Sequence, residues 1–197
     1  MQKTNFRWHG FAALTALLWT GGVLAAKAKT PDPRTLSIDA ALPVPNTTLV
    51  DRSLPAEQVA RMTLAARRYY GFWHTGRAEL ARAALASDFK DLNLPAGRPQ
   101  GPEGPLVASH SFRTAVPDLR LEVEEMLVIG DRVVGRLHFR GHFTGAFGTG
   151  EKARRGDGRS VDFVAIDVYR IRGDRIAENW HLEDNLTLLH QLGLIQE

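Results

Sequence analysis

The sequence predicts an α+β domain in which helices come first and an antiparallel sheet follows. Between residues 56 and 115 apolar side chains recur at steps of three and four, the spacing of amphipathic helices. From residue 119 onward apolar and polar side chains alternate, and the Gly-Asp pairs at 130–131 and 173–174 are typical of hairpin turns. Helices followed by hairpin-linked strands favour an antiparallel sheet that helices cover on one face.

Three helices are expected before the sheet. The first begins after Pro55 and ends at Gly76, and its apolar stripe consists of Val59, Met62, Ala66, Tyr69 and Trp73. The second runs roughly over residues 77–86. A loop rich in proline and glycine follows at residues 91–105, and the third helix spans roughly residues 106–115, before a proline that stops it.

Strands account for most of the remaining chain. The alternating segments are residues 119–129, 132–147, 160–172 and 175–183. A loop of mixed charge at residues 148–158 separates the second strand from the third. An apolar segment that begins at Asn185 predicts a short closing helix.

The N-terminus has the pattern of a secretory signal. Lys3 and Arg7 precede a short apolar segment at residues 11–26, and Ala26-Lys27-Ala28 offers a cleavage site between small residues. We therefore expect residues 1–28 to be a signal peptide and the protein to be periplasmic or secreted. An apolar segment this short falls below the roughly 20 residues of a membrane span, and an uncleaved anchor is the alternative.

Two further segments follow the predicted signal. Residues 29–54 contain four prolines and no sustained apolar period, which predicts a flexible linker. Residues 55–197 are then the folded domain.

Charge and composition exclude several classes of function. The chain has 25 basic and 22 acidic residues, and three of the basic ones with no acidic ones lie in residues 1–28. The remaining chain is neutral overall, so nothing predicts a nucleic-acid partner. Without cysteine, the chain can form no disulfide and has no thiol nucleophile.

The last predicted strand carries the strongest candidate site. Its side chains alternate between two faces, one with Ile176, Glu178, Trp180, Leu182 and Asp184 and the other with Ala177, Asn179, His181 and Glu183. The first set is more apolar and is expected to face the interior. Glu178 and Asp184 would then be buried beside Trp180, where desolvation raises the pKa of a carboxylate toward that of a general base.

Structural roles compete with this interpretation. Asp184 directly precedes the short closing helix and is a good N-cap, and a carboxylate bound to amides has a lowered pKa. Glu178 could form an ion pair with Arg136 or Arg170. The position of the Asp184 carboxylate also discriminates between functions. A carboxylate that opens into a closed apolar cavity favours an enzyme, whereas bonds to the amides of Leu186 or Thr187 with no cavity beside them favour a non-catalytic binding domain.

Metal and phosphate sites are not expected. His138 and His142 lie roughly 13 Å apart if they are on one strand, too far to share an ion. There is no HExxH segment, and the loop GTGEK has Glu151 where a phosphate-binding loop needs lysine. His110 on the third helix could face the sheet, where core packing competes with a role in a pocket.

Four segments carry a family pattern: SFRTAVPDLRLEVEEM (111–126), RGHFTGAF (140–147), GDGRSV (156–161) and GDRIAENWHLEDNLTLLHQLG (173–193). The last fits G-(K/R)-I-x-E-x-W, an Asp four residues after the Trp, and a closing Q-L-G. Over roughly residues 60–195 the chain resembles the SnoaL-like polyketide cyclases, or ester cyclases, of the nuclear transport factor 2-like superfamily.

The resemblance implies a cone-shaped fold in which three N-terminal helices pack on a curved antiparallel sheet and enclose an apolar pocket. It implies no metal or cofactor, dimers packed through the sheet, and Asp184 as the acid–base group of an aldol ring closure. Two positions depart from the family pattern. His142 is displaced by one residue, and Leu92 stands where a histidine is common.

Two functions are consistent with these features. The first is a cofactor-free cyclase, lyase or isomerase that acts on a small apolar carbonyl compound. Its candidate residues are Asp184 as general base, Glu178 or Arg136 as a second polar group, Trp180 as the pocket wall, and His110 and Tyr69 to orient the substrate. The second is a non-catalytic domain of the same fold that binds a small apolar ligand or a protein. Either would be a homodimer without stable membrane association after signal cleavage.

Overall fold

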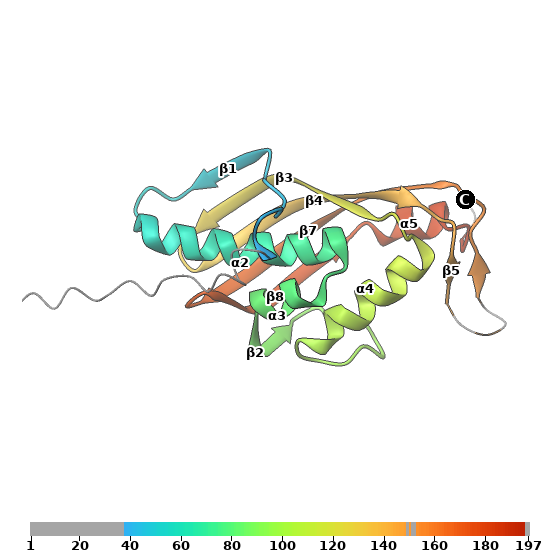
Figure 1. Cartoon of the computed structure of the whole chain (residues 1–197), viewed down its shortest axis with the longest axis horizontal. Coiled ribbons are helices and arrows are strands. Elements are labelled where there is room, and N and C mark those ends of the chain that lie inside the picture. Colours follow the sequence, from blue (N-terminus) through green and yellow to red (C-terminus); the bar gives the residue numbers. More distant parts are fainter. Residues whose placement is uncertain (1–37, 149, 151–152, 196–197) are drawn as a thin grey trace, which may run out of the picture. The chain divides into compact units, whose positions relative to one another are not determined.

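The computed structural model describes residues 38–148, 150 and 153–195 (Figure 1). These described residues belong to one compact unit. The predicted signal peptide and the first part of the predicted linker lie outside the described residues. Within the described residues, no helix combines the length and the apolar character that a bilayer crossing needs.

A six-stranded sheet forms the centre of the fold, in the order β1-β3-β4-β7-β8-β2. The strands are β1 (Thr47–Val50), β2 (Leu85–Asp91), β3 (Arg120–Ile129), β4 (Arg132–His142), β7 (Ser160–Arg172) and β8 (Arg175–Glu183). The four central strands are antiparallel neighbours, as the Gly-Asp turns predicted. The edge strands β1 and β2 each pair in parallel, so the sheet is mixed rather than purely antiparallel. β5 (Ala146–Phe147) and β6 (Arg154–Arg155) form a separate small hairpin.

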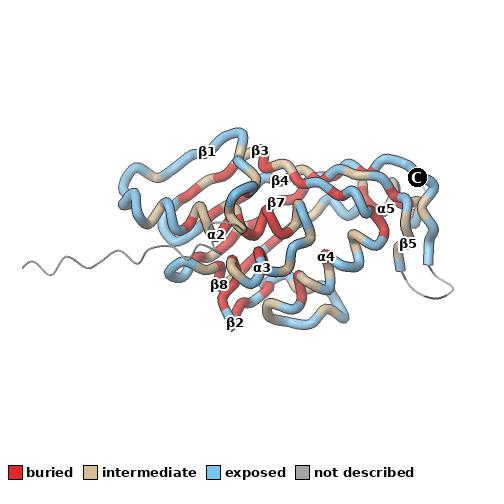
Figure 2. The backbone as a smooth tube through the Cα atoms, in the orientation of Figure 1, coloured by how far each residue is buried: buried red, intermediate tan, exposed pale blue. Residues whose placement is uncertain are grey.

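The helices are α2 (Ala56–Thr75), α3 (Ala78–Ala84), α4 (Glu103–Ala115) and α5 (Asn185–Gln191). α2 runs along the sheet with its aromatic stripe inward, and Tyr69, Tyr70 and Phe72 are all at most 2% exposed. Figure 2 shows the buried backbone where α2 meets the central strands. Gly76 ends α2 with φ = 77°, a conformation that glycine adopts without strain. This α+β architecture confirms the predicted fold class.

The edge strand β1 lies in the segment predicted to be a linker. Its backbone pairs with β3, with Thr47 opposite Glu125. The segment before it is fastened to α2, because Arg68 donates to both carboxylate oxygens of Asp39, at 2.9 and 2.7 Å. The prediction of a flexible linker over residues 29–54 is therefore wrong for residues 47–50. Proline spacing did not reveal a strand whose stability comes from a distant partner.

The other edge strand, β2, replaces the end of the predicted second helix. α3 stops at Ala84, and the chain turns at once into extended pairing with β8, with Leu85 opposite Ile176 and Asp91 opposite Asn179. This pairing brings Asp91 onto the sheet.

A bulge in β8 changes which side chains face the helices. Ile171 pairs with Ile176 and Arg170 with Glu178, so Ala177 is the extra residue. Ile176 and Ala177 are both buried, and the alternation after them is inverted. A one-residue shift moves every following side chain to the opposite face of a sheet.

Candidate active site

A cavity of about 470 Å³ opens between the inner face of the sheet, helices α2 and α4, and the loop around Arg98. Six aromatic side chains contribute to its walls: Tyr69, Trp73, Phe112, Phe139, Phe147 and Phe163. Phe139 and Phe163 stack with their ring centroids 5.0 Å apart, and Trp73 meets Phe139 edge-on. A volume of this size suits a drug-sized molecule.

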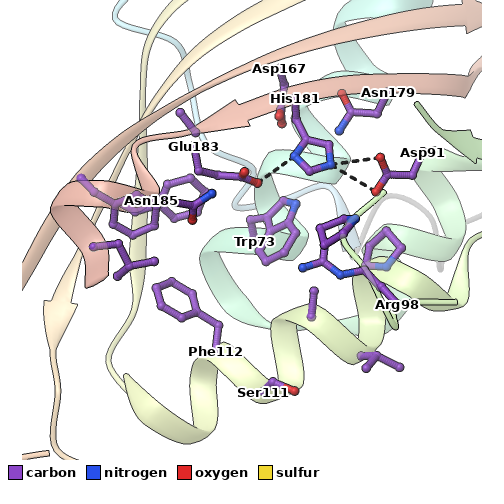
Figure 3. A pocket seen from close by; sticks show the side chains of 18 of the residues that line it. Trp73, Asp91, Arg98, Ser111, Phe112, Asp167, Asn179, His181, Glu183 and Asn185 are labelled. Carbon is purple, nitrogen blue, oxygen red and sulfur yellow. Dashed lines mark hydrogen bonds and ion pairs between the residues drawn. The ribbon is translucent and has the colours of Figure 1, made fainter. Parts of the chain in front are cut away.

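The polar side of the cavity is built around His181 (Figure 3). Its Nδ1 lies 2.8 Å from Glu183 Oε1, and its Nε2 lies 3.0 and 3.1 Å from the two carboxylate oxygens of Asp91. His181 is 5% exposed and Asp91 is 7% exposed. A buried imidazole between two carboxylates binds a proton strongly.

The charges around His181 determine its protonation. Burial favours the neutral ring, but the Glu183 hydrogen bond and the charges of Glu183, Asp167 and Asp91 outweigh it and raise the pKa of His181 to about 9. Burial also opposes ionisation of Glu183, yet the hydrogen bond and charge of His181, with a smaller effect of Arg98, hold its pKa below the ordinary value. At neutral pH the cluster is thus an imidazolium between carboxylates.

Asp167 is a third carboxylate on the cavity wall, 6% exposed on the inner face of β7. Tyr169 donates its hydroxyl proton to Asp167 Oδ2 at 2.5 Å. Burial raises the pKa of Asp167 to about 6, although the Tyr169 hydrogen bond and the His181 charge pull it down. This value is well suited to proton transfer near neutral pH.

Polar bonds across the sheet edge hold the cluster in place. The Asn93 side-chain amide donates to the backbone oxygen of His181 at 2.6 Å. The Gln100 side chain accepts from the Asp91 amide at 2.8 Å and donates to the Asp91 carbonyl at 2.9 Å. The loop after β2 is thereby bound to both strands of the site, to β8 at His181 and to β2 at Asp91.

Comparisons with known proteins agree with this architecture. The family model of the SnoaL-like polyketide cyclases matches residues 63–192. The chain belongs to this family. A solved structure of a candidate polyketide cyclase from Bacillus cereus ATCC 10987 is 41% identical, with 79% of this chain and 95% of that one covered and a TM-score of 0.71. IdmH, a candidate polyketide cyclase from Streptomyces antibioticus, is 26% identical, with 67% and 98% covered and a TM-score of 0.57. A search of curated proteins found no match.

Asp184, the residue that the SnoaL-like pattern implies as acid–base group, lies at the surface and outside the cavity lining. Its Oδ1 accepts from the Thr187 amide at 3.0 Å and its Oδ2 from the Thr187 hydroxyl at 2.7 Å. These two bonds lower the pKa of Asp184. The prediction that Asp184 lies in a dry pocket is wrong, and the residue is the N-cap of α5.

Glu178 and Trp180 lie on the outer face of the sheet, opposite to the prediction, because the bulge at Ala177 inverts the strand. Glu178 accepts from Arg170 Nε at 2.7 Å, one of the two ion pairs that were considered, and this bond lowers its pKa. Trp180 is 44% exposed and does not line the cavity.

The other predicted pocket residues are divided. Arg136 is exposed on the outer face and pairs with Glu124 at 3.2 Å. His110 is exposed on α4 and outside the cavity lining. Tyr69 does line the cavity, and its role in orienting a substrate stays a prediction. The six predicted residues are therefore not brought together.

Four polar residues of the cavity were not predicted from the sequence: Asp91, Asp167, His181 and Glu183. Asp167 had a visible signal, because it falls in phase with the buried residues Val161, Phe163, Ala165, Tyr169 and Ile171 of an alternating strand. His181 and Glu183 required knowledge of the bulge, and Asp91 required recognition of β2. Among the described residues, no group of three His, Asp or Glu side chains has an arrangement that could hold a metal ion.

Proposed function

We propose that this SnoaL-like protein is a cofactor-free enzyme that transfers protons at the carbon beside a carbonyl group of a small, mostly apolar compound, as an aldol cyclisation requires. One observation carries the proposal: three carboxylates and one imidazole, most of them buried, line the same side of an aromatic cavity. Titratable groups with perturbed pKa values in a cavity are typical of catalytic sites.

Asp167 is the proposed general base. Its carboxylate removes a proton from the carbon beside the carbonyl, and the enolate carbon then attacks a second carbonyl of the same molecule. The new alkoxide oxygen takes the proton back from the carboxyl group, so the base is regenerated. Tyr169 orients Asp167 through the 2.5 Å hydrogen bond.

His181 is the proposed electrostatic partner of this base. Both ring nitrogens are engaged by carboxylates, so the imidazolium is held in one orientation. A fixed positive charge in a desolvated cavity stabilises an enolate or alkoxide more than it stabilises the neutral substrate. Because its pKa lies near 9 and that of Asp167 near 6, we expect activity to peak between these values.

The experiment measures the first proton transfer directly. 2-Tetralone is incubated with the protein in D₂O, and exchange of its α-protons is followed by NMR. Asp167→Asn should lower the catalysed exchange rate by about 10²–10⁴-fold, the usual contribution of a general base. Asp184→Asn is the matched control and should retain the rate. Loss of exchange in the control together with an active Asp167→Asn would reverse the assignment.

A non-catalytic binding domain is the second candidate. Its support is that both nitrogens of His181 are already engaged within the protein, which leaves the imidazolium no free N–H for a substrate. This candidate predicts saturable binding of 2-tetralone in the cavity without catalysed exchange.

We also propose that two copies of the chain associate through the outer face of the sheet. The support is an exposed apolar patch on neighbouring strands, made of Val164, Ile166, Trp180 and Leu182, each between 43 and 58% exposed. Ile166→Glu should convert a dimer to a monomer in sedimentation analysis. A wild-type chain that sediments as a monomer would contradict this proposal.

Export from the cytoplasm is a proposal that rests on residues 1–28 alone. Expression of the full chain in a bacterium, followed by cell fractionation and N-terminal sequencing, tests it. A periplasmic product that begins near residue 29 supports cleavage. A membrane-bound product of full length supports the anchor.

A further inference from the structure

The loop between β2 and α4 places a cation at the cavity. Arg98 is partly buried, whereas the residues on either side of it, Gly97 and Pro99, are exposed. Figure 3 shows its side chain extending into the cavity on the side of Asp91 and His181. An arginine of an exposed loop that turns inward loses hydration, which needs compensation from an anion.

The carboxylates nearby are already engaged. Asp91 and Glu183 bind His181, and Asp167 binds Tyr169. Arg98 forms no ion pair with any carboxylate in the part of the chain that the structure describes. Arg98 therefore lines the cavity without a direct ion pair to these residues, although its charge acts on Glu183 from a distance.

The backbone of the loop is held in a defined position on both sides of Arg98. Asn93 and Gln100 bind the backbone of His181 and Asp91 on either side of it. At the start of α4, a Cβ on Gly104 would lie 2.4 Å from the Pro99 oxygen, so the helix packs tightly against the loop. The Arg98 side chain therefore starts from a fixed backbone position at the cavity, which reduces the entropy lost when it binds a ligand.

We propose that Arg98 binds a carboxylate of the substrate, so that the enzyme acts on apolar ring compounds that carry an acid group. A guanidinium pairs with a carboxylate through two parallel hydrogen bonds. A phosphate is disfavoured, because the single positive charge of one arginine would leave a dianion only half neutralised beside Asp91 and Glu183. The aromatic walls contact the apolar rings. That the bound carboxylate belongs to a substrate rests on the proposed function. Binding of a carboxylate at Arg98 does not, and it is tested separately.

The experiment compares two probes of similar shape at pH 7, 2-naphthoate and the neutral ketone 2-acetonaphthone, by calorimetric titration of the full chain. The wild type should bind 2-naphthoate about 10- to 100-fold more tightly, the size of a charge-assisted bidentate contact. Arg98→Gln should remove this preference, and Arg98→Lys should retain part of it. Arg52→Gln, at an exposed arginine outside the cavity lining, should retain all of it.

Several results would overturn the inference. These are equal affinity of the wild type for both probes, no binding of either probe, and an Arg98→Gln variant that still prefers 2-naphthoate. 2-Tetralone has no carboxylate, so the exchange assay reports on the proposed function alone. Preferred binding of 2-naphthoate without catalysed exchange would defeat the enzyme but leave the carboxylate site standing.

Discussion

The inner and outer faces of β8 carry similar chemistry in different surroundings. On the inner face, His181 meets Glu183 and is 5% exposed. On the outer face, Glu178 meets Arg170 beside Trp180, which is 44% exposed. The Arg170 hydrogen bond lowers the pKa of Glu178, so the outer pair is ionised at neutral pH. On the inner side of the sheet, burial raises the pKa of Asp167 to about 6, and the neighbouring carboxylates raise that of His181 to about 9 against the effect of burial. The surroundings therefore separate the two faces more than residue type does.

The largest difference between the faces is expected on removal of a charged partner. His181→Ala leaves Asp91 and Glu183 without their cation, and should cost about 3–5 kcal/mol of unfolding free energy. Arg170→Ala, the matched change on the outer face, should cost much less, because Glu178 can be solvated. Urea unfolding measures both. Equal losses would mean that the inner cluster is solvated in the same way.

The pH dependence of stability gives a second contrast. The pKa of His181 is raised from 6.5 to about 9, so its stabilisation is complete below pH 6.5 and is lost as the pH rises through 9. Asp167, raised from 3.8 to about 6, has the same sign at lower pH, with stability falling from about pH 4 to 6.

We expect about 1–3 kcal/mol of the His181 contribution to disappear between pH 6.5 and 9, measured by urea unfolding at each pH. The His181→Gln variant should lack this loss, which separates His181 from the other histidines. A wild type whose stability rises across the window would show that the imidazole is neutral when folded.

Removal of the Trp180 indole from the outer face should have a smaller effect on the free energy of unfolding. Trp180→Ala should cost roughly 1–2 kcal/mol in a dilute, monomeric sample, less than the roughly 3–5 kcal/mol of a core tryptophan, because nearly half of the side chain is already in water. Its cross-strand neighbour Val168 accounts for much of what is lost. Thermal unfolding at low concentration measures this. A loss of 3 kcal/mol or more would place the indole in the core.

Local patterns were enough to predict the fold class and the four central strands, but not the edge strands or the site. The stripe of α2 and the Gly-Asp turns act over a few residues, and the sequence contains all of that information. The site depends on pairing between distant segments, because β2 brings Asp91 to His181, ninety residues later in the chain. The bulge at Ala177 left no turn residue or proline to mark it, so simple alternation assigned Trp180 and His181 to the wrong faces.

The smallest expected effect on stability concerns Asp184, which lies between the end of β8 and the start of α5. As the N-cap of α5 it satisfies the Thr187 amide, so Asp184→Ala should lower the melting temperature slightly. Asp184→Asn should be nearly neutral, since asparagine caps equally well. Neither variant should change the exchange of 2-tetralone, because the carboxylate lies outside the cavity lining. Thermal unfolding and the exchange assay together decide the matter: a stable Asp184→Asn variant without exchange would return the catalytic role to this residue, despite its lowered pKa.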